Sequence, residues 1–158
     1  VVLISVGVES VVIAVGHGAV IFPLCYVAVI VALGHVAVIA AFGDVAVISA
    51  LWAAAVIAAF VAAAIAAPGD AAVIVALGYA AVIAALGDAA VIAALGNVAV
   101  ISALGDAAVM SAFVAAVTAA VGEVAVVGGV GVEAGITWIG YAAVIDAFWD
   151  AATVAALR

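Results

Sequence analysis

The residues most capable of chemistry in this chain are carboxylates that follow glycines at a regular spacing. Asp70, Asp88 and Asp106 each follow a glycine and stand eighteen residues apart, and Asp44 follows Gly43 in the same way. An ionisable side chain held at bilayer depth costs about 2.5–3.5 kcal/mol and marks an ion or proton pathway. Asp after Gly and before an apolar run is also typical of a turn or a helix N-cap at the water boundary. The spacing is therefore compatible with a channel or carrier, but we favour the interpretation of these aspartates as turn or N-cap residues.

The two histidines, His17 and His35, are also eighteen residues apart. On one helix they would be separated by about five turns, which is too far to share a metal ion. A hairpin or a solenoid would bring them together, but no cysteine or acidic residue completes a convincing ligand set. We therefore interpret them as residues of a repeat and predict no metal site.

A glycine-rich stretch occupies residues 124–135, with the sequence VAVVGGVGVEAG. Gly129, Gly131 and Gly135 resemble a loosened dinucleotide-binding loop that follows a strand. The third glycine is one residue late, and Asp150 is the nearest candidate for the acidic residue that such a site places about 20 residues on. We favour the interpretation of this stretch as a flexible interruption of the repeat. The sequence therefore leaves any cofactor unknown.

The hydroxyl and thiol groups form no catalytic pattern in the sequence. Each serine occupies a small-residue position of the repeat and has no His–acid pair close in sequence. Cys25 is the single cysteine, so an internal disulfide is excluded. We predict no catalytic, cofactor-binding or metal-binding residue, and the chain is more typical of a non-enzyme. The serines are Ser5, Ser10, Ser49, Ser102 and Ser111.

The elements that must position these residues belong to a repeat of nine residues. Residues 69–110 show it most clearly as GDAAVIVAL, GYAAVIAAL, GDAAVIAAL, GNVAVISAL and GDAAVM. The residue after glycine alternates in kind, which indicates a true period of eighteen residues. No linker breaks the array, so residues 1–158 are predicted to form a single repeat-containing domain. The unit shortens to eight residues at three places, from Ser10 to Gly18, from Ala54 to Ala62 and from Ala107 to Ala115.

Composition restricts the class of protein further. The chain is 75% hydrophobic and 6% charged, with a net charge of −8 and Arg158 as its one basic residue apart from histidine. A surface that faces water normally has about 25–35% charged residues. The expected partners are therefore lipid or copies of the chain itself, and the small-molecule partner is unknown. Nucleic-acid binding is excluded, because one arginine cannot neutralise the phosphates of a binding site.

We predict an all-α fold, either an apolar helical repeat array or a membrane-type helix bundle. Alanine is the best helix former, and Val82, Ile83 and Leu86 of one unit lie on one face of a helix. Residues 45–67 form the best membrane span, with 23 residues that include no charge, Gly or Pro. Trp52 is expected in the interior of this span.

The C-terminal segment, residues 136–158, suggests a helix at a membrane interface. Its aromatic side chains would form the belt that such helices place at the level of the lipid headgroups. Ordinary aromatic packing is the alternative. The aromatic residues concerned are Trp138, Tyr141, Phe148 and Trp149.

The alternative fold is an all-β repeat of short strands joined by Gly-X turns. Seven apolar residues followed by Gly-Asp or Gly-Asn are typical of a hairpin with a type II′ turn. A solenoid with coils of eighteen residues is a variant, and its exterior would consist of Ala, Val and Ile. Neither face of such strands alternates to polar residues, which argues against a sheet with one wet face.

The sequence therefore predicts a structural or self-associating hydrophobic protein, embedded in a membrane, with no identifiable catalysis. One alternative is an ion or proton channel or carrier whose spaced aspartates face a common lumen. Another is a soluble protein whose polar side chains are missing from an approximate or designed sequence. That alternative predicts a water-exposed surface of Ala and Val.

Overall fold

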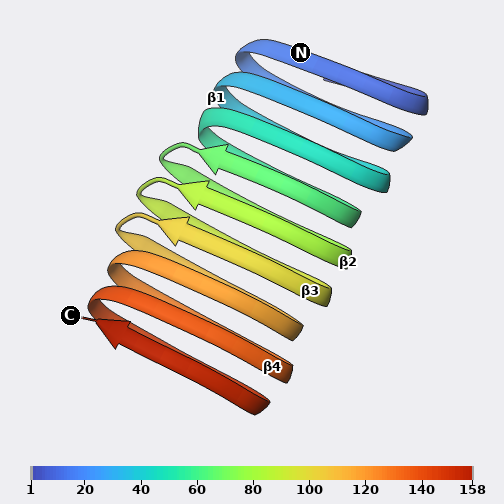
Figure 1. Cartoon of the computed structure of the whole chain (residues 1–158). Coiled ribbons are helices and arrows are strands. Elements are labelled where there is room, and N and C mark those ends of the chain that lie inside the picture. Colours follow the sequence, from blue (N-terminus) through green and yellow to red (C-terminus); the bar gives the residue numbers. More distant parts are fainter. Residues whose placement is uncertain (1, 158) are drawn as a thin grey trace.

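The protein is a flattened β-solenoid, in which the chain winds through stacked coils of parallel strands (Figure 1). The computed structural model describes residues 2–157. Its strands are β1 (Val2–Pro68), β2 (Ala71–Leu86), β3 (Ala89–Leu104) and β4 (Ala107–Leu157), and they neighbour one another in this order. The side chains that are not described within this range are those of Trp52, Val61, Val114, Ala147, Trp149 and Ala152.

The register confirms the period of eighteen residues. Ala71 of β2 pairs with Ala89 of β3, and Ala89 pairs with Ala107 of β4. Each coil therefore consists of two nine-residue units, and each unit lies directly above its equivalent in the next coil. The pairing is parallel, because the chain returns to the same side after every full coil.

Each nine-residue unit forms one straight run and one corner. In β2 the buried residues are alternate ones, first Ala72, Ile74 and Ala76, and then Ile83 and Ala85. The alternation changes from even to odd numbers across Gly78 and Tyr79. Successive side chains of a strand point to opposite faces, so this change marks the corner where the chain turns back. Inward side chains of the two runs consequently meet inside the coil.

The core is a pair of isoleucine columns flanked by alanines. Each buried isoleucine stabilises the fold by about 1.5–3 kcal/mol through removal of its side chain from water. The flanking alanines are small, which fits a close approach of the two sheets. Thr118 is the buried polar residue among those described, and its hydroxyl donates to the carbonyl oxygen of Gly135 at 3.4 Å. One column contains Ile21, Ile39, Ile57, Ile74, Ile92 and Met110, and the other contains Ile30, Ile48, Ile65, Ile83 and Ile101.

Glycine is required where successive corners stack most closely. A Cβ atom on Gly105 would fall on the carbonyl oxygen of Gly87 in the coil before it. The ladder continues through these corners, since the Gly87 amide donates to the Leu104 carbonyl at 2.9 Å. The Ala107 amide likewise donates to the carbonyl of Asp88 at 2.9 Å. The Gly-Asp step thus keeps backbone pairing unbroken around the bend.

Two of the three shortened units are corners that lack one residue. The register changes between Phe60 and Ala62, and again where β3 passes from Gly96 to Ala99 opposite β4. These places correspond to the slips before Ala62 and Ala115. Because the missing residue lies in a corner, the straight runs on both sides keep their inward and outward faces. The first slip is no shortened coil, since the buried Val12 and Ala14 are followed by the buried Ile30 and Ala32 eighteen residues later.

The prediction of an all-α fold is wrong. Residues 45–67 lie in β1, and residues 136–157 lie in β4. No helix is present in residues 2–157, so none there is long and apolar enough to cross a membrane. The all-β alternative is correct, in its variant of a solenoid with coils of eighteen residues; the strands are parallel neighbours and do not form hairpins.

The physical reason is that the unit satisfies both periodicities. Val82, Ile83 and Leu86 share one face of a helix, yet in the strand Ile83 is buried while Val82 and Leu86 are exposed. Helix propensity is a weak preference that tertiary contacts override. When near-identical units eighteen residues apart pair, their backbones form hydrogen bonds and most runs bury an isoleucine.

The prediction of a helix with an aromatic belt for residues 136–158 is also wrong. Trp138 is buried, whereas Tyr141 and Phe148 are exposed. The three side chains therefore do not share one environment. The predicted positions of Trp52 and Trp149 fall on side chains outside those described.

Candidate functional site

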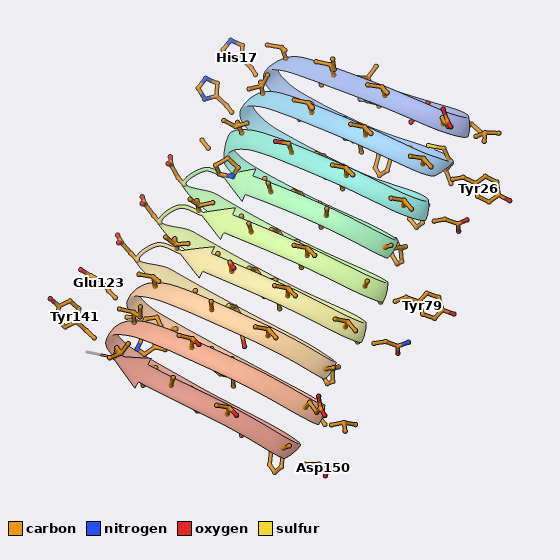
Figure 2. The ribbon with its side chains drawn as sticks, viewed as in Figure 1. His17, Tyr26, Tyr79, Glu123, Tyr141 and Asp150 are labelled. Carbon is orange, nitrogen blue, oxygen red and sulfur yellow. The ribbon has the colours of Figure 1, made fainter. Side chains whose placement is uncertain are left out.

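The carboxylates gather at the two edges of the flattened coil, where the chain turns (Figure 2). We call the edge with Asp70, Asp88, Asp106 and Glu123 the aspartate edge. Its residues stack in one column, since each follows a glycine that lies above the next such glycine. The opposite edge contains Tyr26, Tyr79 and Asp150 in Figure 2. Charge is therefore concentrated along the edges of the molecule.

The predicted aspartates occupy exposed bends. Asp70, Asp88 and Asp106 lie between consecutive strands and are exposed, and Asp44 is also exposed. The interior between the two sheets is filled by isoleucine and alanine. These four aspartates therefore point outward at the corners. The channel alternative requires them to surround a lumen, and they do not. This placement agrees with the turn interpretation.

The solenoid brings the two histidines together. The rings of His17 and His35 are stacked, with centroids 5.2 Å apart and planes inclined by 3°. Both side chains are exposed, and Figure 2 shows His17 pointing away from the coil. Among the described residues, no three His, Cys, Asp or Glu side chains converge as a metal-binding group.

The glycine-rich stretch does not form a dinucleotide loop. Residues 124–135 lie within β4, and a strand follows them where a dinucleotide site requires a helix N-terminus. Gly129, Gly131 and Gly135 are therefore part of the ladder of strands.

One serine meets the cysteine across neighbouring coils. The Oγ atom of Ser10 and the Sγ atom of Cys25 are 3.1 Å apart and share a hydrogen bond. Cys25 is buried, whereas a reactive thiolate occupies an electropositive, partly exposed site. The pair therefore fits a structural role.

A hollow of about 340 Å³ lies where a corner of β4 is shortened. Alanine, valine and glycine form most of its wall, and Glu133 is its one carboxylate. Small-molecule sites combine an apolar wall with several convergent polar groups. This hollow does not have that composition.

The outer surfaces of the two sheets are the most distinctive feature of the molecule. We call one of them the phenylalanine face; it consists of the outward side chains of runs 71–77, 89–95, 107–113 and their equivalents in the other coils. An unbroken column of valines follows this face along the stack. Its members are Val2, Val20, Val38, Val56, Val73, Val91, Val109, Val126 and Val144.

All five phenylalanines of the chain point outward on this one face. Phe42 and Phe113 are 42% and 41% exposed, and Phe148 is more exposed still. The rings of Phe42 and Phe60 stack with centroids 4.6 Å apart. Phe22 lies between the buried Ile21 and Pro23, which turns its side chain outward on the same face.

The opposite outer surface, which we call the leucine face, contains no phenylalanine. On this face the positions equivalent to Phe42, Phe60 and Phe113 are occupied by Leu33, Leu51, Leu86 and Leu104. This asymmetry was not predicted from the sequence. Placing the phenylalanines in the eighteen-residue period, with the two shortened units counted, would have assigned all of them to the same half of the coil.

Comparison of the chain with protein-family models, with curated proteins and with solved structures gave no match.

Proposed function

We propose that this protein is a structural, self-associating β-solenoid whose phenylalanine face packs against the same face of a second copy. The observation that carries this proposal is the collection of all five phenylalanines on one exposed sheet surface. Aromatic side chains are enriched at protein interfaces, where they supply large contact areas. Contiguous exposed apolar surfaces beyond a few hundred Å² mark interaction sites.

The size of the face is sufficient for a stable dimer. From Val2 to Val144 the valine column crosses eight strand spacings, and each run contains seven residues. Spacings of about 4.8 Å and a rise of about 3.3 Å per residue give a surface of roughly 38 Å by 23 Å. This is about 900 Å² per copy, and a standard interface buries about 800 Å² per partner.

The distribution of charge also favours a second copy as the partner. Asp146 is the one carboxylate on the phenylalanine face, and the other acidic residues lie at or beside the corners. A protein interface has the same arrangement of an apolar centre and a polar rim. Two identical ladders also have the same row spacing, so their ridges and grooves match along the whole stack.

Analytical ultracentrifugation of two matched pairs of substitutions tests this proposal. Phe42→Lys with Phe113→Lys places two charges on the phenylalanine face. Leu86→Lys with Leu104→Lys places two charges on the leucine face, at side chains that are 46% and 47% exposed. Both pairs change the net charge equally. We expect the phenylalanine pair to be monomeric and the leucine pair to remain dimeric, with circular dichroism verifying strand content in each.

Three results would overturn the proposal. The first is a wild-type protein that stays monomeric at a concentration of about 100 µM, since a micromolar interface would be occupied there. The second is equal dimerisation of both substituted pairs. The third is a wild-type monomer that binds phosphatidylcholine vesicles, which would assign the face to lipid.

The exposed apolar surface also favours a second candidate, a soluble protein whose polar side chains are missing from an approximate or designed sequence. That alternative predicts small apolar residues on the water-facing surface, and exposed valines are frequent on both outer faces. Intact mass spectrometry separates the candidates, because the sequence corresponds to 15.0 kDa. A heavier chain supports the second candidate, and agreement supports the first.

A further inference from the structure

The geometry points to a two-histidine binding site for a divalent transition-metal ion, formed by His17 and His35 at the end of the aspartate edge. The ion class is the one that imidazole nitrogen prefers, namely Cu²⁺, Ni²⁺ or Zn²⁺. This inference is independent of the proposed self-association, because the histidines lie at a corner and not on either sheet face.

The two side chains are close enough for both to bind one ion after a change of rotamer. Metal–nitrogen bonds of about 2.0–2.1 Å place two neighbouring ligand nitrogens roughly 3–3.4 Å apart. The ring centroids are now 5.2 Å apart and the rings are parallel. An imidazole nitrogen binds a metal ion in the plane of its ring, so each ring must turn out of the stack by roughly 45–55° until the two planes meet at the ion. Both side chains are exposed, so a movement of this size displaces solvent.

The fold places the two histidines next to each other. Their backbones lie in consecutive coils of one continuous strand, β1, and the eighteen-residue period aligns them in a single column. Joining two ligands on one rigid support raises the affinity well above that of either alone. The remaining positions around the ion would be filled by water.

Charge on the rest of the molecule favours cation capture. The net charge of the chain is −8, and Asp70 and Asp88 occupy the same edge further along the stack. A surface of one charge sign raises the local concentration of the opposite ion. These carboxylates are too far along the column to be ligands, since Asp70 lies two coils beyond His35, or roughly 10 Å at the usual strand spacing.

Titration with CuCl₂, followed by calorimetry and electron paramagnetic resonance, tests the site. We expect one Cu²⁺ per chain at the site, with hyperfine coupling from two imidazole nitrogens. His17→Gln and His35→Gln should each weaken Cu²⁺ binding at least roughly tenfold and leave one coupled nitrogen. The double substitution should abolish the nitrogen coupling.

Asp88→Asn is the matched control, because it removes a charge from the same edge and leaves both histidines in place. We expect it to retain the two-nitrogen signal and to change the affinity by less than about threefold, as expected for a distant charge. The inference would be overturned by a wild-type protein whose bound Cu²⁺ shows no coupling to two nitrogens. Unchanged affinity in the double histidine variant would also overturn it, since the ion would then be held by the carboxylates.

Discussion

At the scale of single residues, stability depends on which way a side chain points. The inward positions of most straight runs hold Ala, Ile and Ala, and the isoleucine is almost fully buried in most coils. The neighbouring outward valine is about half exposed. Adjacent residues of similar size should therefore respond very differently to truncation.

Ile92→Ala should lower the free energy of unfolding by about 2–5 kcal/mol, because it removes a fully buried side chain and leaves a cavity in the isoleucine column. Ile92 is 1% exposed, whereas the adjacent Val91 is 46% exposed. Val91→Ala is the control and should cost less than about 1 kcal/mol. Urea denaturation of both variants measures the difference. Equal losses would contradict the assignment of inward and outward faces.

Gly105→Ala should destabilise the fold by about 1–3 kcal/mol or more, because the new Cβ atom would overlap the carbonyl oxygen of Gly87. Gly135→Ala is the matched control, since a Cβ atom there meets nothing within 4 Å. Thermal unfolding by circular dichroism compares the two variants. A Gly105→Ala protein as stable as the Gly135→Ala protein would show that the corners stack less closely than described.

At the scale of elements, the number of residues in a repeat unit can vary at the corners. The two shortened units both lose their residue at a corner, and the runs on either side remain paired. A loss inside a run would reverse every inward side chain after it, because strand side chains alternate with a period of two. This difference explains why the array tolerates interruptions at corners.

Insertion of one glycine between Val114 and Ala115 should be tolerated, because it restores a nine-residue unit at a shortened corner. Insertion of one glycine between Val91 and Ile92 should prevent folding of β3 and its neighbours, because it exposes the following inward residues. Amide hydrogen exchange measures protection in each variant. Similar protection in both proteins would contradict the role assigned to the corners.

At the scale of the whole molecule, negative charge at the edges opposes the packing of apolar faces. The chain has a net charge of −8 at pH 7 and an isoelectric point of about 4.1. Net charge far from zero keeps proteins apart through repulsion. The proposed dimer should therefore be weakest when this charge is unscreened.

Self-association should strengthen as the pH falls from 7 towards 4.1, since the net charge decreases in magnitude over this range. Raising the salt concentration at pH 7 should act in the same direction, because salt screens exposed charges. Sedimentation equilibrium in the two series measures the dimer dissociation constant. A dimer that weakens in both series would show that salt-sensitive ion pairs, and not the apolar face, hold it together.

The candidate sites show how far sequence reasoning extends. The positions of the aspartates in turns followed from their place between glycine and an apolar run. The proximity of His17 and His35 did not follow, because it depends on whether eighteen residues span a helix or return to the start of a coil. The phenylalanine face could not be predicted for the same reason, since Phe42 and Phe60 become neighbours only when the coil closes.

By itself, the sequence determined the nine-residue unit, its doubling to eighteen and the concentration of charge at Gly-X steps. Only the tertiary structure decided between helix and strand. Ala, Val and Ile are apolar in both, and the large residues of the unit satisfy either periodicity. The choice rests on hydrogen bonds and isoleucine contacts between residues seventeen or eighteen apart, which exist only after neighbouring coils have stacked.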